Sequence, residues 1–220
     1  MKDSPRTPAQ ISEPADPGRR PGLRLSLKTA APGESAACGQ DLPITAGFAA
    51  SPFGRCLVAQ TPAGICRLSF PETAEEEAEW TALRQAWPQA RLRRDDAAAA
   101  RTAAVVFRAA PPGYHEQTLR LLAQGTPFQV MVWQALLRIP CGATLSYGQL
   151  AAAIGRPTAV RAVAGAVAKN PIAFLIPCHR VLPASGAIGG YRWGQARKGA
   201  MLAWEKVRPT PRPPQSGIKA

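Results

Sequence analysis

The pattern of apolar and turn-forming residues changes near Gly125, and this change limits the possible folds more than any other feature. Before Gly125, short β-forming runs at residues 44–49, 56–59 and 65–70 are separated by tight Gly/Pro turns. Such short connections are typical of antiparallel strands. Residues 75–86 have the apolar spacing and the acidic start of a helix. We therefore expect an α/β N-terminal domain built on a small antiparallel sheet with helices.

After Gly125 the apolar residues recur at helical spacing. This spacing predicts helices over residues 128–138, 147–154 and 159–169, the second of them capped by Ser146. The last two are joined by a Gly-containing turn, which is the pattern of a helix-turn-helix. Helical hairpins that do not bind DNA have the same pattern, so this alternative stays open.

The two ends of the chain differ in composition from the middle. Residues 1–42 are rich in Pro, Gly, Ser and Arg without periodicity, and residues 208–220 are similar. Such composition predicts a disordered arm and a disordered tail. Between them we expect two domains, an N-terminal one at 43–124 and a mostly helical one at 125–207.

The net charge of +13 is unevenly distributed. Between Gly125 and Lys206 there are nine basic residues and a single carboxylate, Glu205. A basic face is the usual footprint of a nucleic-acid partner, although charge that serves only solubility is the alternative. A lone acid in such a region is expected to be engaged by a basic group, either a functional one or a surface neighbour such as Arg197.

Cys178 and His179 lie side by side in the hexapeptide at residues 176–181 (Ile-Pro-Cys-His-Arg-Val). A thiolate is the nucleophile of sulfur chemistry, and an adjacent base or positive charge generates it. The alternative is a buried structural cysteine that ends an apolar strand. The other four cysteines lack CxxC spacing, so we expect reduced intracellular thiols, no metal site and no cofactor.

The chain resembles the O6-alkylguanine-DNA alkyltransferases, most closely the alkyltransferase half of the bacterial adaptive-response protein. The residues that carry the resemblance lie at 125–129 (GTPFQ), 139–142 (IPCG), 146–147 (SY), 159–163 (AVRAV), 170–171 (NP), 176–181 (IPCHRV) and 189–194 (GGYRWG). It implies a ribonuclease-H-like N-terminal domain and a winged helix-turn-helix in the C-terminal domain. It also implies repair of double-stranded DNA by a single, irreversible transfer of an alkyl group to the protein.

The resemblance assigns roles residue by residue. Cys178 matches the alkyl-accepting nucleophile, His179 the base that acts through a water, and Glu205 the acid that orients the histidine. Asn170 matches the residue that supports the active-site turn. Tyr147 matches the residue that crowds the 3′ phosphate of the target nucleotide.

The same comparison assigns the DNA and substrate contacts. Arg161 matches a residue that enters the minor groove and fills the space left in the base stack. It lies on a helix face that includes Val160 and that Ala159 and Ala162 keep narrow. The predicted substrate pocket consists of Ile188, Gly189, Tyr191, Arg192 and Trp193. Trp193 stands where other members can have Gly, so we expect a narrow pocket that reacts slowly with O6-benzyl groups.

The expected setting is that of a monomeric, cytoplasmic protein of bacterial type without a membrane segment. O4-methylthymine is a second possible substrate. A thiol hydrolase and a purely DNA-binding helix-turn-helix protein remain as rival functions. The first leaves the basic region unexplained, and the second leaves Cys178, His179 and Glu205 unexplained.

Overall fold

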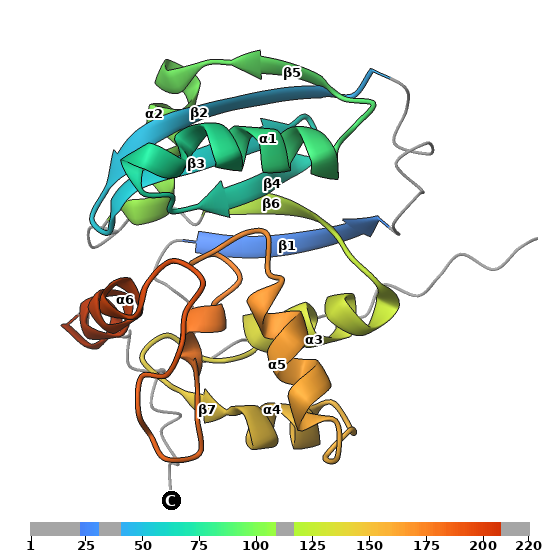
Figure 1. Ribbon diagram of the computed structural model, residues 1–220, viewed down its shortest axis with the longest axis vertical. Helices are drawn as coiled ribbons and strands as arrows, with labels where there is room; N and C mark the ends of the chain where they lie inside the picture. Colours follow the sequence, from blue (N-terminus) through green and yellow to red (C-terminus); the bar gives the residue numbers. More distant parts are fainter. Residues whose placement is uncertain (1–22, 31–40, 109–116, 208–220) are drawn as a thin grey trace, which may run out of the picture.

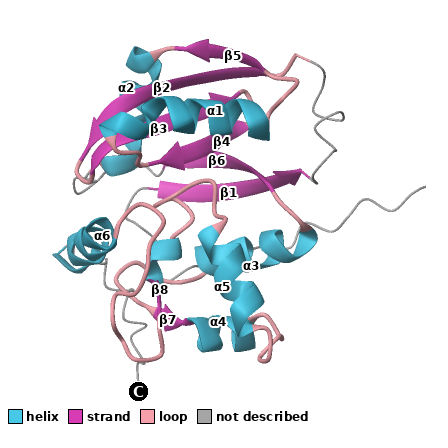
Figure 2. Ribbon diagram, viewed as in Figure 1, coloured by secondary structure: helices cyan, strands magenta, loops and turns pink. Residues whose placement is uncertain are grey.

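The computed structural model describes residues 23–30, 41–108 and 117–207, and within them the chain is a mixed α/β structure (Figure 1). The large sheet and the helices beside it occupy one half, and the remaining helices with a two-stranded sheet occupy the other (Figure 2). The strands of the sheet are β1 (Leu23–Ala30), β2 (Pro43–Ser51), β3 (Gly54–Thr61), β4 (Gly64–Ser69), β5 (Arg91–Arg94) and β6 (Gln117–Gln124). The helices are α1 (Glu76–Ala86), α2 (Asp96–Phe107), α3 (Pro127–Leu137), α4 (Tyr147–Ala153), α5 (Val160–Ala168) and α6 (Gln195–Val207).

The six-stranded sheet has the order β1-β6-β4-β3-β2-β5. Strands β2, β3 and β4 pair antiparallel, as the tight turns predict. The prediction of an antiparallel sheet is wrong for the rest, because β1 and β4 pair parallel to β6 and β2 pairs parallel to β5. Parallel neighbours are joined by long crossovers, which leave no turn signal in the sequence.

Strand β1 also corrects the prediction that residues 1–42 lack regular structure. Leu23, Leu25 and Leu27 alternate with polar residues, which is the period of a strand. Composition alone hid this pattern. The other residues of the expected arm before Asp41, and the tail at 208–220, lie outside the described residues.

Successive side chains of each strand point to opposite faces of the sheet, and packed residues cover both faces. On β3, Leu57 and Ala59 pack with Trp80 and Leu83 of α1. Their neighbours Cys56 and Val58 belong to a second core on the opposite face.

This second core is continuous with the interior of the helical half. It runs from Phe53 beside the sheet through Trp133 of α3 and Val163 of α5 to Met201 of α6. The predicted boundary near Gly125 therefore separates a strand-rich segment from a helix-rich segment, and the two share one hydrophobic core. Burial of this common core stabilises the two halves together.

Helix α4 begins at the predicted residue, Tyr147, and α3 begins at Pro127, one residue before the predicted start. The Thr126 and Ser146 side chains each accept a hydrogen bond from the backbone amide three residues on. The Gln129 and Gln149 side chains accept one from the Thr126 and Ser146 amides, which completes two capping boxes. The helices α4 and α5 are joined by residues 154–159. Two-residue strands β7 (Leu145–Ser146) and β8 (Val181–Leu182) pair parallel and tie this unit to the segment after Cys178.

Among the described residues, no helix is both long and apolar enough to cross a bilayer.

Candidate active site

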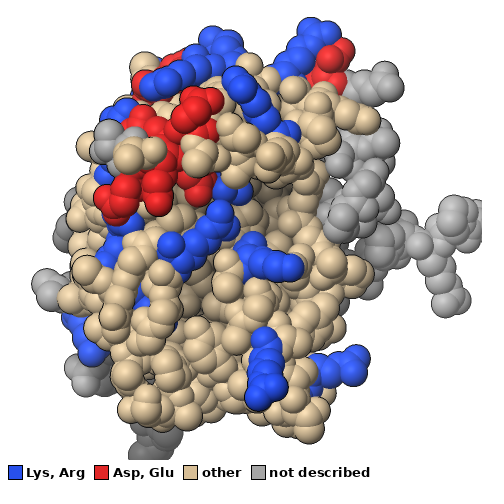
Figure 3. All heavy atoms as spheres, in the orientation of Figure 1, with Lys and Arg blue, Asp and Glu red and all other residues tan. Residues whose placement is uncertain are grey.

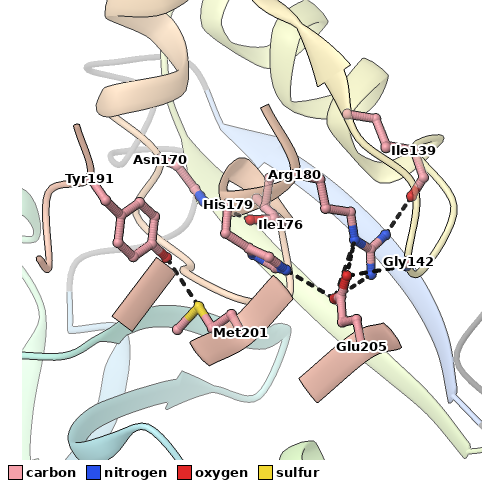
Figure 4. Close-up of polar contacts among 9 residues, drawn as sticks. All are labelled: Ile139, Gly142, Asn170, Ile176, His179, Arg180, Tyr191, Met201 and Glu205. Carbon is pink, nitrogen blue, oxygen red and sulfur yellow. Dashed lines mark hydrogen bonds and ion pairs between the residues drawn. The ribbon is translucent and has the colours of Figure 1, made fainter. Parts of the chain in front are cut away.

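Cys178 begins a short 3-10 turn, η3 (Cys178–Arg180), that follows a buried apolar segment. The turn is held from the N-terminal side by Asn170, which is fully buried. Its side-chain amide donates to the Ile176 carbonyl (2.8 Å) and to Cys178 Sγ (3.1 Å). Its Oδ1 accepts from the Ile172 amide (2.9 Å). One amide thus fixes the backbone before the cysteine (Figure 4) and also contacts the sulfur of Cys178.

The sheet also supports this segment. The Leu68 amide donates to the Pro171 carbonyl (3.1 Å), and the Ala173 amide donates to the Leu68 carbonyl (2.8 Å). A one-residue parallel bridge between Leu68 and Ile172 therefore joins strand β4 to the segment that leads to Cys178. Phe174 has a φ of 66°, unusual for a bulky residue, and its ring stacks on the His179 imidazole at 5.8 Å.

Glu205 and His179 form a buried pair. His179 Nε2 lies 2.9 Å from Glu205 Oε1, and both side chains have no exposed surface. The Gly142 amide donates to the other carboxylate oxygen (3.3 Å). The surface alternative for Glu205 is wrong, and Arg197 pairs with Glu72 instead.

Arg180 completes the set around Glu205. Its Nε lies 2.9 Å from Oε2, its Nη2 lies 2.8 Å from Oε1, and its Nη1 donates to the Ile139 carbonyl (Figure 4). Burial alone would raise the pKa of the Glu205 carboxyl, but the hydrogen bonds from His179 and Arg180 hold that pKa well below its usual range. Glu205 is therefore a permanent anion facing the imidazole.

The Cys178 thiol lies in an apolar setting. Burial raises its pKa, while Asn170, Tyr191 and Lys198 act in the opposite direction. The thiol is consequently protonated at neutral pH until a base removes the proton. This differs from a cysteine that is a thiolate at rest because of nearby positive charge.

Lys198 is a site residue that the sequence interpretation missed. It is 1% exposed, and its Nζ donates to the Val181 carbonyl (2.8 Å). Burial lowers the pKa of its ammonium, and the nearby Cys178 partly offsets this effect. A basic residue four positions after a Gly-rich turn carries no sequence signal of burial, so only the fold shows it.

Two tyrosines lie close to the sulfur. Burial raises the pKa of Tyr147 and, more strongly, that of Tyr191, and the charge of Cys178 raises both further. The Tyr191 hydroxyl also donates to Met201 Sδ (3.5 Å). The structure thus brings together Cys178, Asn170, Tyr147 and Tyr191, with His179 and Glu205 directly beside them.

Of the residues predicted to contact DNA, Tyr147 lies at the start of α4 and the other four lie on α5 and just before it. Arg161 and Ala162 are exposed, Val160 is 37% exposed and Ala159 is half-buried. On the face drawn in Figure 3, acidic side chains gather over the N-terminal half, and the helical half carries basic side chains without acidic ones. The charge segregation predicted from the sequence is visible on that face.

The predicted pocket residues lie between β8 and α6. Ile188 is 37% exposed, and Gly189 has a φ of 66°, which favours glycine. Trp193 is buried, with its ring 5.3 Å from the Tyr191 ring. The Arg192 guanidinium lies over the Trp193 ring and 3.6 Å from Glu79 of α1.

Comparison with known proteins adds independent findings. Residues 127–207 match the family model described as the DNA-binding domain of 6-O-methylguanine DNA methyltransferase. The regulatory protein Ada of Salmonella typhimurium is 46% identical over 153 residues, which cover 70% of this chain and 43% of that protein. The methylated-DNA--protein-cysteine methyltransferase of Mycobacterium tuberculosis is 53% identical over 93 residues, or 42% of this chain and 56% of that protein. The chain thus spans about half the length of the curated relatives that it matches.

A solved structure is similar over almost its whole length. The crystal structure of the Mycobacterium tuberculosis O6-methylguanine methyltransferase superposes with a TM-score of 0.60 at 34% sequence identity. The similarity covers 77% of this chain and 96% of that one. With the family match over the helical half and the buried Cys178, His179 and Glu205, these findings show that the chain belongs to the O6-methylguanine-DNA methyltransferase family.

Proposed function

We propose that this protein repairs DNA directly by moving an alkyl group from O6 of guanine to Sγ of Cys178. One observation carries the proposal. A buried cysteine, hydrogen-bonded by Asn170, is followed directly by a histidine whose Nε2 is held by a permanently ionised Glu205. The basic, acid-poor helical half around this set suits a DNA substrate.

The chemistry follows from the protonation states. When Nε2–H donates to Glu205, the lone pair of the imidazole lies on Nδ1, which accepts the thiol proton through a water molecule. The sulfur attacks the alkyl carbon, and the S–C bond forms as the C–O6 bond breaks. The guanine leaves and takes up a proton, for which the Tyr147 hydroxyl is a candidate donor. Glu205 stabilises the imidazolium, by the logic of other catalytic triads.

The product is a thioether on Cys178, and this has a kinetic consequence. Water does not hydrolyse a C–S thioether under these conditions, so each molecule reacts once. The activity is that of a single-turnover methylated-DNA--[protein]-cysteine S-methyltransferase. O4-methylthymine offers the same O-alkyl chemistry and is a second candidate substrate.

We further propose that α4 and α5 form a winged helix-turn-helix that enters the minor groove. The face made by Ala159, Val160 and Ala162 is slim enough for close approach, and Arg161 projects from it. Arg161 fills the space that the target nucleotide leaves when it rotates out, and Tyr147 crowds its 3′ phosphate.

The flipped base is received by Ile188, Gly189, Tyr191, Arg192 and Trp193. Backbone groups near Gly189 contact the guanine edge, and the Tyr191 and Trp193 rings form a wall. Because the Trp193 ring is bulky and buried, we propose that small alkyl groups react faster than benzyl groups.

The remaining proposals concern organisation. Residues 43–124 form a ribonuclease-H-like α/β unit, and residues 125–207 form the catalytic, DNA-binding unit. The protein acts as a monomer in the cytoplasm. In the described ranges the exposed large hydrophobic side chains are Met131, Val160 and Ile188, two of which lie on the proposed DNA side, which leaves little apolar surface for a dimer.

A labelled-substrate assay tests the proposed function. The protein is incubated with duplex DNA carrying O6-[³H-methyl]guanine. We expect at most one label per protein molecule, lost in Cys178→Ala and retained in Cys141→Ala, a matched change at a half-buried cysteine of the same half. Binding without transfer would support a DNA-binding protein, and turnover of an ester substrate would support a thiol hydrolase. Either result would refute the proposal.

A further inference from the structure

Arg197, in the first turn of α6, joins the pocket wall to the sheet. Its side chain is only 14% exposed. Its Nε donates to the Phe53 carbonyl (2.8 Å) in the turn between β2 and β3, and its Nη1 donates to the Phe70 carbonyl (3.2 Å) just after β4. Nη1 also donates to the Trp193 carbonyl, and Nη2 pairs with Glu72 Oε1 at 3.1 Å. One guanidinium therefore binds three separate chain segments at once.

Only an arginine can make this set of contacts. The guanidinium is planar and offers five N–H donors in a fixed fork, whereas a lysine ammonium is a compact point charge. The group also lies over the Phe70 ring, 5.6 Å from its centre. A lysine would keep the charge but could not reach the carbonyls of Phe53, Phe70 and Trp193 together.

A second link runs parallel to the first. Glu79 of α1 accepts from Arg67 (2.6 Å) and Ser69 (2.9 Å), both on β4, and lies 3.6 Å from the Arg192 guanidinium. The Trp193 ring meets the Phe70 ring edge-on at 6.3 Å. Two adjacent pocket residues are thus held by the N-terminal half. Arg192 pairs with Glu79, and Trp193 contacts the Phe70 ring and is bound through its carbonyl by Arg197.

We propose that Arg197 is a positioning residue that fixes the pocket wall, residues 189–194, against the N-terminal sheet. The sheet thereby controls how large an alkyl group the pocket accepts. The second statement rests on the proposed function, whereas the first concerns the conformation of the wall alone. Arg197 acts through Trp193 and is not a catalytic residue.

Hydrogen–deuterium exchange tests the clamp without any substrate. In Arg197→Met we expect amide exchange of residues 189–194 to rise about tenfold, while α4 and α5 stay as in the wild type. Lys206→Met, which removes an exposed charge from the same helix, should leave both unchanged. If Arg197→Met loosened all elements equally, or Arg197→Lys matched the wild type, the clamp would be refuted.

Arg192→Gln serves as a second, milder variant if Arg197→Met folds poorly. Its side chain is 41% exposed, and its loss breaks the Glu79 link and the contact with the Trp193 ring while Arg197 keeps its bonds. We expect a smaller increase in exchange, again confined to residues 189–194. No change in these amides would contradict the role of the sheet in holding the wall.

Transfer rates test the control of alkyl size. For DNA carrying O6-benzylguanine or O6-methylguanine, we expect the benzyl-to-methyl rate ratio to rise about tenfold in Arg197→Met and to stay constant in Lys206→Met. A constant ratio in Arg197→Met with altered exchange would refute the control of size alone. Absence of any transfer by the wild-type protein would instead refute the proposed function.

Discussion

Exposed ion pairs of the sheet half can be compared with the buried ion pairs around Glu205 in the helical half. In the sheet half, Arg91 pairs with Asp41 and Arg94 with Asp96, and all four side chains are largely exposed. In the helical half, Arg180 and His179 meet Glu205 with at most 6% of any of these side chains exposed. The geometry is similar, with distances of 2.6 to 3.2 Å, yet the surroundings differ.

This difference in burial decides what each pair can do. Water screens exposed charges, so such pairs contribute little to stability. A buried carboxylate that loses its partner becomes an uncompensated charge. Removal of the carboxylate likewise leaves a buried guanidinium unpaired. Glu205 can therefore hold His179 in one tautomer, whereas Asp41 has no comparable influence.

The largest expected effect is that of Glu205→Gln. The change leaves the buried Arg180 without its anion, so we expect a loss of about 3 kcal/mol in the free energy of unfolding. Methyl transfer should fall about a hundredfold or more, because the imidazole loses its orienting acid. Denaturant unfolding and single-turnover kinetics measure the two effects. Wild-type stability in this variant would contradict the contrast between buried and exposed pairs.

The acid limb of the stability curve should sharpen the same contrast. The folded-state pKa of Glu205 lies below its unfolded value of about 4.3. Its contribution is therefore complete above the unfolded pKa and is lost as pH falls toward the folded pKa. Stability of the wild type should decline from about pH 4.5 downward, and that of Glu205→Gln should decline less steeply. Parallel curves from urea titrations between pH 3 and pH 7 would show that another group dominates.

Lys198→Met should separate stability from reactivity. Burial disfavours the ammonium, so its replacement by an apolar side chain should leave the unfolding midpoint equal or higher at pH 7. The positive charge of Lys198 lowers the pKa of the Cys178 thiol and so favours the thiolate, and the transfer rate should fall about tenfold without it. Lys206→Met, on the same helix but exposed, is the control. An unchanged rate would exclude an electrostatic role for Lys198.

Arg161→Ala should slow the reaction with DNA and leave the stability of the fold unchanged. The side chain is exposed on α5, so thermal unfolding should not change. The second-order rate constant on duplex DNA should drop about tenfold, because the vacated stack is no longer filled. Arg138→Ala, an exposed arginine at the end of α3, provides the comparison. Equal rates for both variants would remove Arg161 from the proposed DNA contact.

The smallest effect is expected for Asp41→Asn in the sheet half. Its pair with Arg91 is exposed, and the hydrogen bond from Arg91 lowers the pKa of Asp41. Neither the unfolding midpoint nor the transfer rate should change measurably. A clear loss of stability would mean that exposed pairs contribute here as buried ones do.

Much of the local structure was predictable because its causes are local. The hairpins of β2, β3 and β4 follow from turns, and the starts of α3 and α4 follow from capping boxes at Thr126 and Ser146. Strands β1 and β6 were missed since their parallel pairing joins residues about 94 positions apart, such as Leu23 and Gln117. Pairing over that distance leaves no turn signal, although β1 itself has the alternation of a strand.

The sequence by itself determined the chemistry of the site. The Cys178–His179 pair, the lone carboxylate at Glu205 and the basic helical half were all visible in residue types and their counts. The tertiary structure alone decided the environment of each group. It buried Glu205 with Arg180, placed Lys198 near the sulfur and joined the pocket wall to the sheet through Arg197. Burial and long-range contacts depend on which distant segments pack together, and this packing governs the strength of every charge in the site.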